Sequence, residues 1–182
     1  VLIIAIAIGF VFDFARPTAL AIEHDKQTAA ALALAKTALI GYAASDANRP
    51  GELPCPDVNN DGQLTLGIDF TGGAGSPCVS LLGRFPWKTL GLPDLRDGSG
   101  ERLWYALSDS FHAGATSKID NDTKGTLTIT GTSPALSVIA VIFSPGSVVG
   151  TQVRDTANEN TIANYLEGGN ETGIATSTFV TG

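Results

Sequence analysis

Residues 1–44 read VLIIAIAIGFVFDFARPTALAIEHDKQTAAALALAKTALIGYAA, and this stretch decides the fold class. Its first part, Val1 to Phe12, is entirely apolar or glycine, and its second part, Thr18 to Ala44, is rich in alanine and leucine. Because alanine, leucine and lysine favour helix, the sequence predicts one helix over residues 1–44. At 1.5 Å per residue it would be about 65 Å long. That is longer than a globule of the remaining residues is wide, so part of the helix must project or be covered by other molecules.

The first part of this predicted helix has no polar face. A helix that is apolar on all sides is not an ordinary surface helix. The run Val1–Phe12 would span about 18 Å, which is too short to cross a hydrocarbon core of about 30 Å. It is therefore either the visible part of a longer membrane-spanning segment or a buried core helix. The chain holds no methionine, even at position 1, so we expect a processed product or a piece of one.

Four residues interrupt the apolar pattern. Gly9 and Pro17 are the weakest helix formers of the segment, so we expect the helix to loosen or kink between them. Asp13 and Arg16 are three positions apart and could form an ion pair on one side of the helix. We therefore divide the chain into a hydrophobic helix segment, residues 1–17, and an amphipathic helix with a globular head, residues 18–182.

The second part of the helix carries an apolar stripe. Apolar residues recur three and four positions apart at Leu32, Ala35, Leu39 and Tyr42. We expect this stripe to pack against the head. The segment Arg49-Pro50-Gly51 stops the helix.

The rest of the chain predicts a small sheet. Gly125–Gly131 alternates apolar residues with threonine, which is typical of a strand. Leu136–Ser144 is a continuous β-branched run that Pro145-Gly146 ends, and it indicates one buried strand. Glu101–Ser110 is either a short strand or a helix. These three segments predict an α+β fold in which the C-terminal half of the helix packs on a small antiparallel sheet.

Long loops complete this expected head. Gly51–Gly100 is turn-rich but too aromatic to be a free linker, so we expect it to fold over the domain as an irregular connection. Gln152–Gly182 is polar, with Tyr165-Leu166 and Phe179-Val180 as its expected apolar anchors.

The only two cysteines are Cys55 and Cys78. With no CxxC and no Cys/His cluster, zinc, iron–sulfur and c-type haem sites have no ligand set. An even cysteine count in turn-rich sequence favours one disulfide and an oxidising compartment. The alternative is two unpaired, buried thiols.

Charge and motif content weigh against two function classes. Eighteen acidic against eleven basic residues give a net charge of −7, which is the wrong sign for sequence-independent nucleic-acid binding. The chain has two histidines and no G-x-S-x-G, so we predict no catalytic residues and no enzyme.

One loop has the spacing of a calcium site. Asp57, Asn59 and Asp61 place oxygen acceptors at alternate positions, and Gly62 follows them, as in the first half of a calcium-binding loop. The twelfth position holds Ile68 instead of glutamate. The alternative is an Asx turn, because Asn-Asn-Asp-Gly is also typical turn sequence. Calcium is the one cofactor that the sequence suggests.

Several longer segments carry a family resemblance. The run VLIIAIAIGFVFDFARP holds Gly9 and, eight residues later, Pro17. Downstream follow RPGELPCPDVNNDG, GRFPWKTLGLPDLRDGSGERLWYAL, VIFSPG and NYLEGGN. The first run resembles the N-terminal helix of bacterial type IV pilins and pseudopilins, and the downstream segments resemble proteobacterial proteins with a prepilin-type N-terminus. In that family a processing site and a helix glutamate would lie upstream of Val1.

The resemblance implies a structural subunit of an extracellular filament, in which the head faces solvent and sets adhesion. The implied partners are copies of the chain, the pilus assembly machinery, a prepilin peptidase and, before assembly, the inner membrane. An Asp13–Arg16 pair would limit the cost of charge in a dry filament core. The residues implied to form that core are Val1, Leu2, Ile3, Ile4, Ile6, Ile8, Phe10, Val11, Phe12 and Phe14.

Two alternatives to a major filament subunit stay open. One is a minor pilin or a type II secretion pseudopilin. The other is a membrane-anchored extracytoplasmic module that binds calcium or another ligand and does not polymerise.

Overall fold

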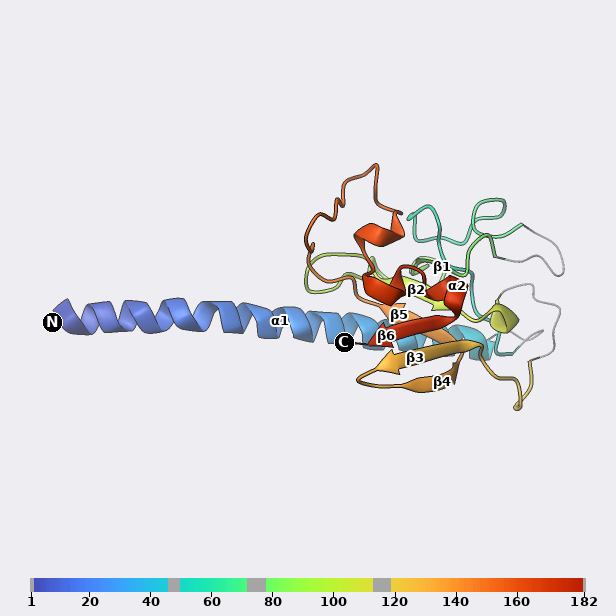
Figure 1. The fold of residues 1–182 in the computed structure, drawn as a ribbon, viewed down its shortest axis with the longest axis horizontal. Coiled ribbons are helices and arrows are strands. Elements are labelled where there is room, and N and C mark those ends of the chain that lie inside the picture. Colours follow the sequence, from blue (N-terminus) through green and yellow to red (C-terminus); the bar gives the residue numbers. More distant parts are fainter. Residues whose placement is uncertain (1, 46–49, 72–77, 113–118, 182) are drawn as a thin grey trace.

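A computed structural model describes the backbone of residues 2–45, 50–71, 78–112 and 119–181, and the side chains of those ranges from residue 19 onward. One helix, α1 (Leu2–Ser45), precedes a head with two three-stranded sheets (Figure 1). The C-terminal half of α1 runs along the head, and its N-terminal half projects from it (Figure 1). The predicted α+β fold with a long N-terminal helix is confirmed.

The first sheet has the order β1-β2-β5 and is antiparallel throughout. The second has the order β4-β3-β6, with β3 antiparallel to β4 and parallel to β6. The strands are β1 (Leu82–Arg84), β2 (Trp104–Leu107), β3 (Leu127–Gly131), β4 (Ala135–Val138), β5 (Ala140–Phe143) and β6 (Thr178–Thr181). The short helical turns are η1 (Asp109–Phe111), η2 (Ile162–Asn164), η3 (Gly168–Asn170) and α2 (Gly173–Thr176).

Strand β2 lies between two hydrophobic cores. Tyr105 and Leu107 belong to the core that contains the buried side of α1. Trp104 and Ala106 belong to the core that contains Phe179 of β6. Because successive strand residues point to opposite faces, α1 covers one face of the first sheet and the second sheet covers the other. A strand buried on both faces needs no alternating pattern, which explains the uninterrupted run LWYAL.

The run Leu136–Ser144 is not one buried strand, so that prediction is wrong. It forms β4 and β5, which pair with β3 and β2 in different sheets. Ser137 adopts a left-handed backbone with φ 58°, and Leu136 in β4 is 79% exposed. The chain changes sheets at Ile139, where the continuous β-branched pattern gives no signal of a break.

Two strands were missed because their sequences are short or polar. β1 lies inside Gly51–Gly100, which was predicted to be irregular, and it pairs with β2. β6 lies in the polar C-terminal segment and pairs with β3. Of the expected anchors there, Tyr165, Leu166 and Phe179 are buried, but Val180 is 44% exposed because it points to the opposite side of β6 from Phe179.

Candidate assembly helix and its support in the head domain

The head covers α1 along one narrow stripe. From Ala19 onward the buried side chains of α1 are Ala31, Ala35 and Leu39, each four positions from the next and therefore on one side of the helix. Leu32 and Tyr42 are half-buried beside them. The predicted stripe is thus confirmed, although Ala31 was not part of the prediction.

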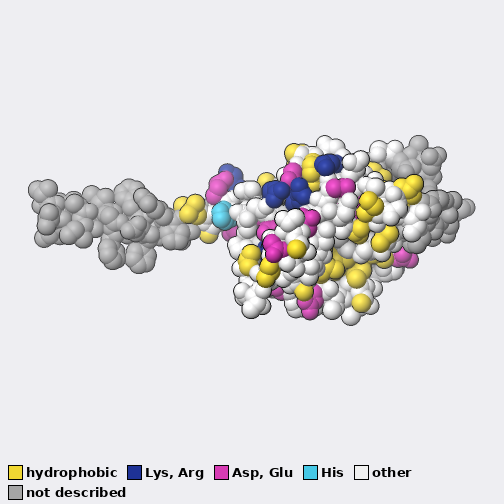
Figure 2. Space-filling view, turned by 90° about the horizontal axis from the view of Figure 1, so that it is seen from above, with side chains coloured by type: hydrophobic (Ala, Val, Ile, Leu, Met, Phe, Trp, Pro, Cys, Tyr) yellow, Lys and Arg dark blue, Asp and Glu magenta, His cyan; other side chains and the backbone are white. Residues whose placement is uncertain are grey.

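α1 exposes large apolar residues outside its contact with the head. These are Leu20, Ile22, Leu34 and Ile40, which are 42–67% exposed. Ile22 and Ile40 are about five turns apart, so both lie on one side, away from the buried stripe. In Figure 2 apolar side chains lie on α1 before it reaches the head, and charged ones follow. An apolar surface of this kind is typical of contact with lipid or with another protein.

The same helix passes a test for membrane spans. Among the described residues, Ala19–Ser45 is a 27-residue segment that is long and apolar enough to cross a membrane, judged by length and composition alone. The core helix of a soluble protein can pass the same test. Only 17% of its most apolar window is buried, however, so the head does not account for its composition.

The predicted assembly side chains, from Val1 to Phe14, lie outside the described side chains, as do Asp13 and Arg16. Their roles stay predictions. The backbone of α1 is helical at both Gly9 and Pro17, and the expected loosening between these two residues also stays a prediction.

A tight loop of the head, Asp97–Gly100, holds α1 through backbone contacts. The Gly98 amide donates to Thr28 Oγ1 over 2.9 Å, and Gln27 Nε2 donates to the Asp97 carbonyl over 3.1 Å. The buried Asp97 carboxylate accepts hydrogen bonds from the amides of Ser99, Glu101 and Gly146 and from the Ser144 hydroxyl. Asp97 therefore ties its own loop to the segment after β5. The sequence predicted only a turn-rich connection over Gly51–Gly100 and gave no sign that this loop contacts the helix.

Gly98 is expected to be intolerant of a side chain. A Cβ at this position would lie 2.2 Å from the backbone oxygen of His24. We expect Gly98→Ala to lower the free energy of unfolding by about 2 kcal/mol, because the loop must move off α1. Gly41→Ala is the matched control: a Cβ there meets nothing within 4 Å, and alanine should stabilise the helix by about 1 kcal/mol. Denaturant titration measures both, and equal effects would contradict this role of Gly98.

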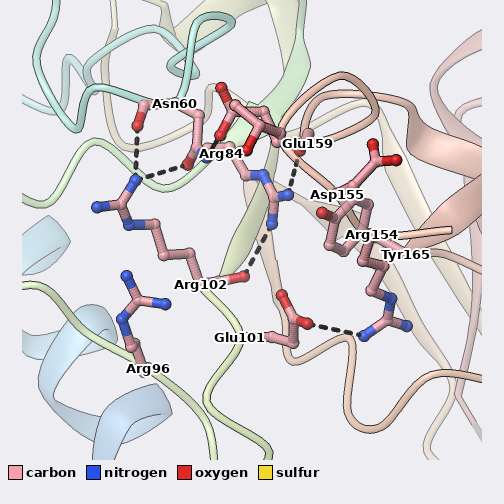
Figure 3. Close-up of a pocket in the computed structure, with 10 residues that line it drawn as sticks. Asn60, Arg84, Arg96, Glu101, Arg102, Arg154, Asp155, Glu159 and Tyr165 are labelled. Carbon is pink, nitrogen blue, oxygen red and sulfur yellow. Dashed lines mark hydrogen bonds and ion pairs between the residues drawn. The ribbon is translucent and has the colours of Figure 1, made fainter.

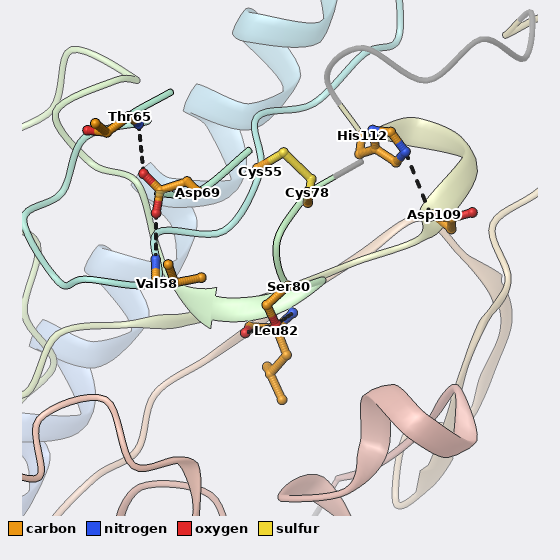
Figure 4. Close-up of a disulfide and its surroundings, with 9 residues drawn as sticks. All are labelled: Cys55, Val58, Thr65, Asp69, Cys78, Ser80, Leu82, Asp109 and His112. Carbon is orange, nitrogen blue, oxygen red and sulfur yellow. Dashed lines mark hydrogen bonds and ion pairs between the residues drawn. A yellow bond between two sulfur atoms is a disulfide. The ribbon is translucent and has the colours of Figure 1, made fainter. Parts of the chain in front are cut away.

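A disulfide joins Cys55 and Cys78, as predicted, with the two Cα atoms 5.4 Å apart (Figure 4). Cys55 is fully buried and Cys78 nearly so, in the core that packs against α1. The bond closes the loop that carries the candidate calcium residues. It thereby fixes an irregular segment in the core that packs against α1.

Loss of this disulfide should destabilise the head strongly. For a loop of this length we expect the Cys55→Ser/Cys78→Ser double variant to lose about 3 kcal/mol, since the unfolded chain regains the freedom that the bond removes. Thermal unfolding of the oxidised, reduced and variant proteins measures the loss. Identical melting temperatures for all three would show that the bond is not formed in the purified protein.

The loop around Asp57 is built on carboxylate-to-backbone hydrogen bonds. Asp57 Oδ1 accepts from the amides of Asn59 and Asn60 at 3.0 and 2.7 Å, and its Oδ2 accepts from Gly62 at 2.6 Å. Burial raises the pKa of Asp57 against these three bonds, which favour the charged form. Asp69, also buried, binds the amides of Val58 and Thr65 (Figure 4). This is the pattern of an Asx turn, and the Asp57 oxygens already have partners.

Calcium at Asp57, Asn59 and Asp61 stays a prediction that a chelator tests. Among the described residues, no three His, Cys, Asp or Glu side chains form a group that could hold a metal ion. We expect EGTA to leave the melting temperature unchanged and Asp57→Asn to cost about 2 kcal/mol, because an amide nitrogen would face backbone donors. A chelator-induced fall that added calcium reverses would instead establish a metal site.

Comparison of the chain with protein-family models, with curated proteins and with solved structures finds no match. What the structure adds to the sequence resemblance is therefore architectural. An apolar N-terminal helix is followed by small sheets and a disulfide-closed loop.

Proposed function

We propose that the chain is a structural subunit of an extracellular filament of the type IV pilus kind, assembled through the N-terminal half of α1. One observation carries the proposal: the head buries α1 only along the stripe from Ala31 to Leu39, while the apolar sequence continues to Val1. An apolar helix surface that the head does not bury is stabilised when lipid or other copies of the chain remove it from water. The gain is about 25 cal/mol per Å² of apolar surface buried.

In a filament, each copy of the chain can cover the apolar helix of the next copy. Contacts between different surfaces of successive copies do not close, and they generate a fibre. In this proposal a prepilin peptidase cleaves the chain and the helix then resides in the inner membrane. The assembly machinery subsequently transfers the helix into the filament core. The disulfide agrees with a head that folds outside the cytoplasm.

A membrane-anchored binding module is the second candidate, and the length and composition of Ala19–Ser45 favour it. In that case the helix contacts lipid permanently and the chain does not polymerise. A minor pilin or pseudopilin lies between the two, since it assembles in few copies.

Electron microscopy of sheared surface material, with peptide mass spectrometry of the fibres, tests the proposal. We expect thin, uniform fibres composed mainly of this chain. Recovery of the chain only in the membrane fraction, with no such fibres, would overturn a major filament role and favour the anchored module or a minor subunit.

A further inference from the structure

Four of the six arginines in this acidic chain line one cavity of the head. The cavity has a volume of about 220 Å³, and the guanidinium groups lie around it (Figure 3). The arginines are Arg84, Arg96, Arg102 and Arg154. They come from β1, from the segment before β2 and from the long connection after β5. Neither the helix nor the proposed filament contacts require this cluster.

Arg84 is the unusual member because it is buried and forms no direct salt bridge with a carboxylate among the described residues; Glu101 acts on it only at longer range. It is 2% exposed, and its Cζ lies 4.3 Å from the ring centroid of Trp104 and 3.9 Å from that of Tyr165. Its Nη1 and Nη2 each donate to a backbone carbonyl, of Arg102 and Glu159, while its Nε has no partner within the described part of the chain. Burial lowers the pKa of Arg84, and Glu101 only partly opposes this effect, so an anion that enters the cavity would add to the stabilisation of its charge.

The other three arginines already have carboxylates. Arg96 and Arg102 share Asp94, each at 2.8 Å, and Arg154 lies 3.6 Å from Glu101. With Asp155 and Glu159, which also line the cavity, four carboxylates therefore stand against the four arginines. Because these formal charges cancel, a phosphate dianion would add two uncompensated negative charges to the cavity, whereas a ligand with one carboxylate adds only one.

The two remaining carboxylates give the ligand a second property. Glu159 Oε2 accepts from Asn60 Nδ2 at 2.9 Å, and Asp155 Oδ1 accepts from Asn158. Each carboxylate has further lone pairs, which can accept hydrogen bonds from hydroxyl groups. A ligand with hydroxyls beside one carboxylate would use both kinds of lining group.

We propose that this arginine-lined cavity binds a sugar acid of the hexuronate class. Its carboxylate lies against the guanidinium group of Arg96, near the buried charge of Arg84, and its hydroxyls donate to Glu159 and Asp155. The cavity is smaller than the pockets that hold drug-sized molecules, which suits a single sugar ring. This site does not depend on filament assembly, since all of its residues are in the head.

Fluorescence of the full chain in detergent micelles provides the first test, with glucuronate as the probe. Trp87→Phe leaves Trp104, on whose ring Arg84 lies, as the only tryptophan. We expect a saturable change in its emission with glucuronate and none with glucose, which lacks the carboxylate. No saturable change, or equally tight binding of acetate or inorganic phosphate, would overturn the proposal.

Two variants separate the carboxylate from the hydroxyl contacts. Arg96→Gln should weaken glucuronate binding about tenfold, as expected for one charge-assisted hydrogen bond, whereas Lys124→Gln, the same charge loss outside the cavity, should change it less than twofold. Glu159→Gln should weaken glucuronate but strengthen acetate, because the neutral amide is a weaker hydroxyl acceptor than the carboxylate and the repelling charge is lost. Stronger glucuronate binding by Glu159→Gln, or equal effects of Arg96→Gln and Lys124→Gln, would overturn the assigned contacts.

Discussion

Ala35→Glu is expected to detach the head from α1 and to cost about 4 kcal/mol of folding free energy. Ala35 has no exposed surface and lies in the middle of the buried stripe, against the core that holds Tyr105 and Leu107. A glutamate there would be an unpaired charge in an apolar interface, with no room for its side chain. Denaturant titration of the full chain in detergent, followed by tryptophan fluorescence, measures the loss.

Ala33→Glu is the matched control, because it makes the same chemical change two positions away. Ala33 is exposed on α1, so we expect its variant to remain within about 0.5 kcal/mol of the natural sequence. Similar losses of unfolding free energy for both variants would mean that any added charge destabilises the helix, whether or not the position is packed against the head. No loss for Ala35→Glu would mean that the stripe does not hold the head.

The second large effect concerns assembly. Ile8→Asp places a charge in the apolar run, and a charge at the centre of a membrane helix costs about 3 kcal/mol. On that scale we expect filaments to fall about a hundredfold. The unfolding free energy of the head should not change, because the N-terminal half of α1 projects from it (Figure 1). Immunoblots of sheared and membrane fractions measure filaments and the precursor pool separately.

Ile8→Leu is the control for this substitution, since it keeps the apolar character and the volume of the side chain. Its filament yield should equal that of the natural sequence. Normal filaments from Ile8→Asp would exclude the run Val1–Phe14 from the filament core. Loss of the chain from both fractions would place the defect in membrane insertion and not in assembly.

Some of the candidate site was predictable because it depends on local sequence. The stripe through Ala35 and Leu39 follows from helical periodicity. The turn at Asp57 follows from the ability of short carboxylate and amide side chains to bond nearby amides. The disulfide followed from the number of cysteines and the turn-rich sequence between them. Each of these needs only neighbouring residues or a count.

The arginine-lined cavity and the contact of the Asp97–Gly100 loop with α1 could not be predicted in this way. Arg84 and Arg154 are 70 positions apart in sequence, and only the folded head brings them to one cavity. The contact of Gly98 with α1 likewise joins residues that no local pattern relates. Tertiary packing decides such contacts, because its energy depends on which surfaces meet and not on the sequence around each residue.

By itself, the sequence determined a long apolar helix, an α+β head and one disulfide, since periodicity, composition and cysteine number act locally. Only the tertiary structure decided that Leu136–Ser144 divides between two sheets and that β6 runs parallel to β3. The physical reason is that strand pairing joins segments that are far apart in the sequence. Because β2 is buried on both faces, α1 packs against one face of its sheet and the second sheet packs against the other.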